Sequence, residues 1–145
     1  MFASFTKGFK SGGWNARVTD PRDFVLFRPE SVTSIEVGLK STWLDNSLRL
    51  NLTYFDARYK DFIVTAINPA TNSFITVNAA KMHNRGVEGE LAWQPQEAVT
   101  FFANFGTNDA KYTQSTTAAI SLSNKVKRTP KATYSLGAEL REPAG

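Results

Sequence analysis

Apolar and polar residues alternate with a period of two along several parts of the chain. In residues 99–106, Val99 and Phe101 fall on one side of the pattern, while Thr100 and Asn104 fall on the other. Successive side chains of an extended strand point to opposite faces. The pattern therefore predicts a strand with one mainly apolar face and one more polar face.

The same alternation recurs in residues 3–9, 34–41, 48–55, 86–93 and 131–138. No segment sustains the three-and-four spacing of apolar residues that an amphipathic helix requires. We therefore predict an all-β fold, an antiparallel up-and-down meander of about six strands.

The expected connections alternate in length. Short turns are predicted at 44–47 and 94–97, where Asp, Asn and Pro favour tight reversals. Long loops are predicted at about 10–32 and 113–127, and a hairpin tip at 68–72 joins two strands about twice as long as a bilayer requires. Short turns at one end and long loops at the other are typical of outer-membrane barrels, with the short turns in the periplasm. The meander is thus predicted to be part of a large outer-membrane β-barrel.

Two tryptophans support this interpretation. Trp43 and Trp93 each come at the end of a predicted strand, just before a short turn. Outer-membrane barrels carry a girdle of aromatic residues at each membrane interface, and we expect both tryptophans to belong to the periplasmic one. The alternative is that both are core residues of a soluble sandwich.

Charged residues of both signs share the polar side of the pattern. We expect the following to face the lumen of the barrel: Glu36, Lys40, Arg49, Glu88, Glu90, Lys131 and Glu139. There, opposite charges on neighbouring strands could pair. In a soluble domain, the same residues would form a solvated sheet surface.

Composition excludes several classes of function. The chain has no cysteine, so it has no disulfide, thiolate metal site or thiol nucleophile. Its net charge of +4 is scattered, apart from a short basic run at 125–131, and we predict no nucleic-acid partner. The single histidine, His83, has no neighbours at metal-ligand spacing. We predict no enzyme activity, no catalytic residue, no metal and no cofactor.

Several phrases resemble a known family. They are Phe-Thr-Lys-Gly-Phe-Lys-Ser-Gly-Gly-Trp-Asn at 5–15, Phe-Arg-Pro-Glu at 27–30, Glu-Val-Gly-Leu-Lys at 36–40, Asn-Arg-Gly-Val-Glu-Gly-Glu-Leu at 84–91, Asn-Asp-Ala-Lys-Tyr at 108–112 and Thr-Pro-Lys-Ala-Thr-Tyr-Ser-Leu at 129–136. Together they resemble consecutive barrel strands of TonB-dependent receptors. The resemblance covers nearly the whole chain, but it lies in strands and not in a catalytic signature.

The resemblance implies a transporter that takes up ferric siderophores or a similar large nutrient across the outer membrane. Such barrels close with about 22 strands around a plugged lumen. Residues 1–145 are therefore expected to form only part of the barrel, without plug, signal peptide or closing strand. Outer-membrane lipid is an expected partner, and TonB is expected to act only through the absent plug.

The first long loop is the expected site of ligand contact. Trp14, Arg17, Arg22 and Arg28 supply an aromatic face and cations suited to an anionic iron chelate. Two alternatives remain open at this point. One is a soluble β-sandwich that binds sugar or protein through its loops, and the other is an outer-membrane barrel or adhesin that does not transport.

Overall fold

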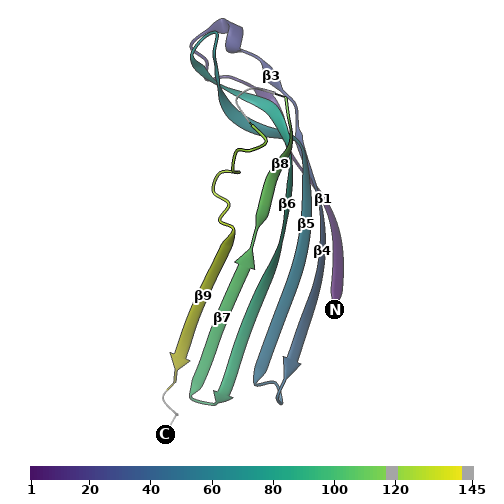
Figure 1. The fold of residues 1–145 in the computed structure, drawn as a ribbon, viewed down its shortest axis with the longest axis vertical. Coiled ribbons are helices and arrows are strands. Elements are labelled where there is room, and N and C mark those ends of the chain that lie inside the picture. Colours follow the sequence, from purple (N-terminus) through teal and green to yellow (C-terminus); the bar gives the residue numbers. More distant parts are fainter. Residues whose placement is uncertain (117–120, 142–145) are drawn as a thin grey trace.

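The structure, a computed structural model, describes residues 1–116 and 121–141. Its main feature is one antiparallel sheet in which strands that follow one another along the chain lie side by side (Figure 1). In spatial order the strands are β1 (Phe2–Lys10), β4 (Glu30–Trp43), β5 (Leu48–Asn68), β6 (Ser73–Gln96), β7 (Val99–Thr107) and β9 (Ala132–Leu140). Strand β8 (Asp109–Ser115) continues beyond β7 along the upper part of β6. The predicted up-and-down meander is confirmed.

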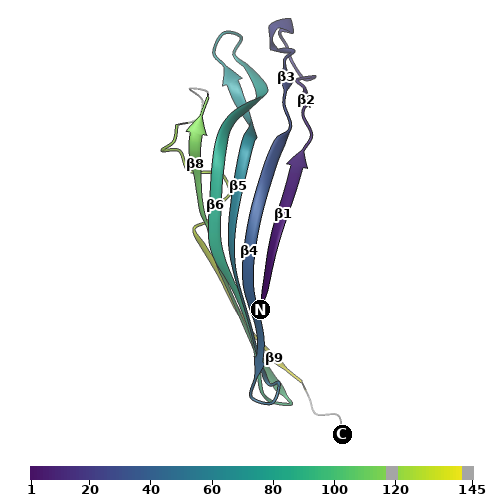
Figure 2. The ribbon, with the colours of Figure 1, turned by 90° about the vertical axis from the view of Figure 1, so that its right-hand side faces the viewer.

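The sheet is a single curved layer, seen from the side in Figure 2. Strands β1 and β9 form its two edges, and within the described residues they do not pair with each other. A sandwich needs a second sheet packed on the apolar face. The remaining strands of the described chain, β2 (Gly13–Trp14) and β3 (Leu26–Phe27), form only a two-stranded ribbon at the long-loop end. The described residues therefore form one large sheet and not the two packed sheets of a sandwich.

The two short turns lie together at one end of the sheet. The first is the predicted turn at 44–47, in which Leu44, Asp45 and Asn46 all have positive φ angles, 53°, 53° and 69°. The second turn is shorter than predicted, because β6 runs to Gln96 with a register shift between Trp93 and Gln96. A strand end with such an irregularity tolerates Pro95, which has no amide hydrogen to donate.

Strands β5 and β6 form a hairpin that extends well beyond the rest of the sheet, with lengths of 21 and 24 residues. A membrane strand needs only about 9–11 residues, so these two strands are about twice as long as a membrane crossing would require. A bulge interrupts the hairpin at the register shift between Tyr59 and Phe62, where Asp61 has a φ of 53°. Bulges bend a strand and increase its twist. The upper hairpin accordingly curls over the sheet (Figure 1).

The two predicted long loops contain more structure than expected. Residues 10–32 include β2, a 3-10 turn η1 (Pro21–Asp23) and β3, and β4 already begins at Glu30, opposite Lys10. At the second loop, β8 continues to Ser115, and residues 117–120 lie outside the described part. The ribbon was missed because two-residue strands are too short to show alternation.

The sheet has almost no buried core of its own. The only buried apolar residues of the described chain are Ala57, Ala79, Ala80 and Met82. Large apolar side chains are instead exposed on one face, as the strand register establishes: Phe5, Ile35, Val37, Trp43, Tyr54, Trp93, Phe101, Phe105, Tyr134, Leu136 and Leu140. We call this surface the apolar band.

None of the helical segments in the described residues has the length and apolar character needed to cross a membrane.

Candidate functional site: a loop docked on the long hairpin

The face opposite the apolar band carries the charged residues expected to line a lumen. The register places these six on that one face: Glu36, Lys40, Arg49, Glu88, Glu90 and Glu139. Lys131 lies just before β9 and is exposed. Polar bonds cross this face between strands, from Asn51 Nδ2 to Glu90 Oε2 (3.2 Å) and from Asn104 Nδ2 to Ser135 Oγ (3.1 Å).

Opposite charges on this face do not pair across strands in the way we expected. Within the described residues, the recorded ion pair on this face joins Glu139 Oε1 to Arg141 Nε at 2.7 Å, two positions along the chain. The other charged residues face the solvent of an open polar surface. Their role as lumen residues stays a prediction.

Trp43 and Trp93 lie on the apolar band, next to the short turns. Leu48 stands opposite Trp43 on one side and Trp93 on the other, so the two tryptophans belong to one row across β4, β5 and β6. The Trp93 ring lies 5.9 Å from that of Phe101, the next residue in the row. This row marks the lower limit of the band.

At the opposite end, the loop of residues 11–29 lies against the upper hairpin. Asn15 makes the first contact and is only 8% exposed. Its Oδ1 accepts a hydrogen bond from the amide of Thr76 (2.7 Å), and its Nδ2 donates to the carbonyl of the same residue (2.8 Å). The side chain thereby extends β6 sideways as a neighbouring strand would.

A second contact is made by Asp23, at the end of η1. The residue is 1% exposed, and its carboxylate accepts hydrogen bonds from Asn68 Nδ2 and Thr71 Oγ1, both at 2.6 Å. These donors, Thr71 above all, lower the pKa of Asp23 below its usual value despite burial. The hairpin tip is thus fixed to a charged carboxylate of the loop.

A third contact joins the end of the loop to the bulge. Asn78 accepts a hydrogen bond from the amide of Arg28 (2.5 Å) and donates Nδ2 to the carbonyl oxygens of Arg28 and Asp61, both at 2.8 Å. The Asp61 carboxylate binds Arg28 Nη2 at 2.8 Å. The bulge therefore both bends the hairpin and turns Asp61 toward the loop.

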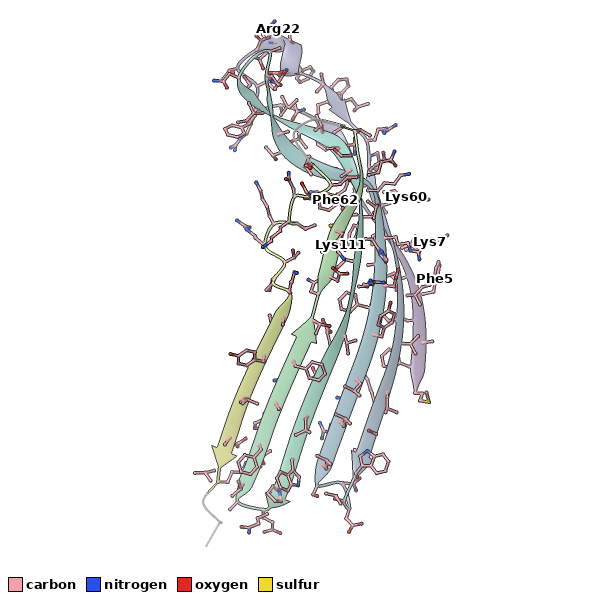
Figure 3. All side chains as sticks on the ribbon, viewed as in Figure 1. Phe5, Lys7, Arg22, Lys60, Phe62 and Lys111 are labelled. Atoms are coloured by element: carbon pink, nitrogen blue, oxygen red, sulfur yellow. The ribbon has the colours of Figure 1, made fainter. Side chains whose placement is uncertain are left out.

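The four residues expected to contact a ligand all lie on this docked loop. Trp14 is exposed and stacks on Phe24, with ring centroids 5.2 Å apart. Arg22, at the top of the molecule in Figure 3, forms a pair of short bonds with Asp20 (2.9 and 2.7 Å). This pairing lowers the pKa of Asp20 to about 2 and raises that of Arg22. Among the described residues, Arg17 has no recorded ion pair.

The sequence matches the family described as TonB dependent receptor-like, beta-barrel, over residues 1–145. The chain belongs to this family. It is therefore part of an outer-membrane β-barrel receptor. The apolar band is then the surface that faces lipid.

Solved structures share the fold of this receptor barrel. The ferric yersiniabactin uptake receptor of Yersinia pestis superposes with a TM-score of 0.76 at 20% identity, over 94% of this chain and 20% of its own. The siderophore receptor PiuA of Acinetobacter baumannii gives 0.69 at 21%, covering 94% and 21%. The ferripyoverdine receptor of Pseudomonas aeruginosa, solved with ferripyoverdine bound, gives 0.66 at 20%, covering 98% and 18%. The chain spans about a fifth of these proteins.

Two groups of polar residues in this receptor barrel were not identified from the sequence. The docking residues Asn15, Asp23 and Asn78 have no signature, because Asn and Asp are common in any loop. The second group is a set of charged side chains that directly follows the apolar band on the same face. The sequence of β5 contains a pattern that could have revealed this group. Asp56 and Arg58 follow Tyr54 at every second position, so all three side chains lie on one face of the strand.

His83 belongs to this second group, and its recorded partner is a carboxylate. Its Nε2 lies 2.7 Å from Asp56 Oδ2, and that carboxylate also takes Arg58 Nε at 3.2 Å. The described residues contain no group of three or more His, Cys, Asp or Glu side chains that could hold a metal ion.

Proposed function

We propose that this chain supplies a wall sector and part of the extracellular ligand-binding surface of a receptor that imports a ferric siderophore or a comparably large nutrient. The observation that carries the proposal is the docked loop, which presents an aromatic pair and exposed guanidinium groups on the upper part of the long hairpin. Membership of the receptor family supports it. So do the printed names of the structural neighbours, which describe siderophore receptors.

The chemistry of the loop suits an anionic iron chelate that carries aromatic chelating groups. Trp14 and Phe24 offer exposed aromatic surface for chelating rings. Arg17 has no recorded ion pair among the described residues, so all its guanidinium donors can bind a carboxylate or a phenolate of the ligand. Arg22 and Arg28 are engaged by Asp20 and Asp61, but their side chains remain 69% and 71% exposed and keep further donors for a ligand.

The rest of the wall has a supporting role in the proposal. The polar face with Glu36, Lys40, Glu88 and Glu90 lines the lumen, where a wetted surface lets a polar nutrient pass. The Trp43 and Trp93 row anchors the barrel at the periplasmic interface. Energy is supplied by TonB acting on a plug, and this sector holds no part of that step.

Uptake of radioactive iron tests the proposal. Cells that lack the gene are complemented with the complete gene and given ⁵⁵Fe as hydroxamate, catecholate or phenolate chelates. We expect uptake of at least one class, and we expect deletion of tonB to abolish it. Binding without uptake would support the alternative of a non-transporting barrel or adhesin. If no class is bound or taken up, the ferric siderophore is refuted as the nutrient.

Substitutions in the loop locate the ligand surface. Trp14→Ala and Arg17→Gln should each weaken binding of the active chelate, by about 5- to 100-fold for loss of one hot-spot contact. Arg128→Gln, in the other long loop, is the matched control. Equal effects at Arg17 and Arg128 would argue against a specific site on the first loop.

A further inference from the structure

The lipid-facing surface changes character sharply along the strands. Above the apolar band, five side chains form one row across neighbouring strands: Lys7 opposite Thr33, Thr33 opposite Arg58, Arg58 opposite His83, and His83 opposite Lys111. The row directly beneath consists of exposed Phe5 and Ile35 on β1 and β4, followed by Asp56, Arg85 and Asp109 on β5, β6 and β8. The apolar band therefore gives way to charged side chains within one step on β1 and β4. On β5 and β6 the change lies one step lower, where Tyr54 and Val87 are beneath Asp56 and Arg85.

More cations flank this row on the same face. We call the outward cations Lys7, Arg58, Lys60, Lys81, Arg85 and Lys111 the outer cation patch. Figure 3 shows Lys7, Lys60 and Lys111 at the level where the sheet gives way to the tall hairpin, with Phe5 just below Lys7. All six are exposed.

The patch has more positive than negative charge. Asp56 is shared by Arg58 and His83, and Asp109 by Lys111 (2.8 Å) and Arg85 (3.6 Å). Within the described residues, no ion pair is recorded for Lys7, Lys60 or Lys81. Lys7 Nζ instead lies 5.6 Å from the ring centre of Phe5. Six cations against two carboxylates leave a strongly cationic surface.

The height of the patch matches the upper edge of a membrane. Thr33 lies ten residues from Trp43 along β4, and the same separation holds between Arg58 and Leu48 on β5. Ten residues at about 3.3 Å each span about 33 Å of strand. With a tilt of about 35–45°, this becomes about 25 Å along the barrel axis, which is the height of the apolar band of such barrels. The patch thus lies where lipid headgroups begin.

The opposite edge of the band has no comparable feature. Next to the Trp43 and Trp93 row, the turns contribute Asp45 and Glu97 and no lysine or arginine. The two short turns therefore differ in charge from the outer cation patch at the other end of the band.

We propose that the outer cation patch binds a phosphate-bearing lipid of the outer leaflet, with its phosphate groups on the cations and its acyl chains along the apolar band. Arg58 and Arg85 donate pairs of hydrogen bonds to phosphate oxygens, and the lysines act as mobile point charges. Phe5, Ile35 and Tyr54 contact the upper part of the chains. The proposal is independent of which nutrient is transported.

Lipid retention tests the proposal on the protein as extracted from the outer membrane in a non-ionic detergent. The probe is bisphosphorylated lipid A, and bound lipid is counted by native mass spectrometry across a lipid titration. Each cation near an anionic lipid surface contributes roughly a five-fold gain in affinity. The triple variant Lys7→Gln/Lys60→Gln/Lys81→Gln should therefore bind the probe about 100-fold more weakly than the wild type.

The matched control moves the same charge change to the other face. Lys10, Lys40 and Lys131 project from or next to the polar face, so their replacement by Gln should leave lipid binding unchanged. Dephosphorylated lipid A should bind the wild type at least as weakly as the phosphorylated probe binds the triple variant, because it loses the contacts to Arg58 and Arg85 as well.

Several results would overturn the proposal. They are equal binding by the triple variant and the wild type, equal loss in the control variant, or equal binding of the dephosphorylated lipid. Tight binding of inorganic phosphate alone would show an anion site that does not recognise lipid. Migration as a heat-modifiable band checks that each variant is folded. The variant Lys7→Arg/Lys60→Arg/Lys81→Arg keeps the positive charges and must therefore bind the lipid as the wild type does.

Discussion

Replacement of Asn15 by Ala should release the loop that we propose binds the nutrient. The Asn15 side chain makes two hydrogen bonds to the backbone of Thr76, in a position that is almost closed to solvent. Each contributes about 1 kcal/mol, so the docked state should lose about 2 kcal/mol relative to the open one. This free energy corresponds to an open population about 30-fold larger.

Limited trypsin digestion measures this population, because the exposed Arg17 lies two residues after Asn15. When cleavage is slow compared with reclosing, its rate follows the population of the open state. We therefore expect cleavage after Arg17 to be about 30-fold faster in Asn15→Ala, and cleavage after Arg128 in the other loop to be unchanged.

Asn15→Asp sharpens the test, because it keeps the size and the acceptor but loses the donor to the Thr76 carbonyl. It too should open the loop, since a carboxylate would then face that carbonyl oxygen. If the ratio of cleavage at Arg17 to cleavage at Arg128 stays at the wild-type value in both variants, Asn15 does not hold the loop and our account of the docking is wrong.

Three further predictions concern charge and packing. The folded pKa of Asp23 is lowered, so its stabilisation of the docked loop should be complete at neutral pH and be lost as the pH falls below about 4; tryptophan emission should report this transition, and its persistence in Asp23→Asn would contradict the assignment. Leu52→Lys places a charge near the middle of the apolar band and should cost about 2–4 kcal/mol in urea unfolding, whereas Thr53→Lys on the polar face should cost far less; equal costs would mean that the two faces are wrongly assigned. A Cβ at Gly86 would meet the backbone of a neighbouring strand and an aromatic ring, so Gly86→Val should destabilise the barrel by about 1–3 kcal/mol, while Gly137→Val, which has open space, should be nearly neutral in the same assay.

The strands and their faces could be predicted because both follow from local rules. Side chains alternate along any strand, so Leu48, Leu50 and Leu52 had to share a face in whatever sheet they joined. The short turn at 44–47 was equally local. The second turn was predicted too long, because the irregularity that keeps Pro95 within β6 depends on pairing with β7.

The candidate site was only half predictable. Trp14, Arg17, Arg22 and Arg28 could be chosen by chemistry, but their partners could not. Arg28 meets Asp61 across 33 positions of sequence, and only the bulge in β5 turns that carboxylate toward the loop. Whether a guanidinium group is free or already paired depends on such contacts.

The sequence by itself determined the class of the fold, the two-faced character of each strand, the unequal ends of the sheet and the resemblance to receptor barrels. These features depend on residues close together in the chain. Tertiary structure alone decided how the first long loop docks on the hairpin and how single cations of separate strands become one patch. Asn15 meets Thr76 across 61 positions, and Lys7, Arg58 and Lys111 share a row only through the strands between them. Pairing register, which sets these meetings, is a property of the assembled sheet.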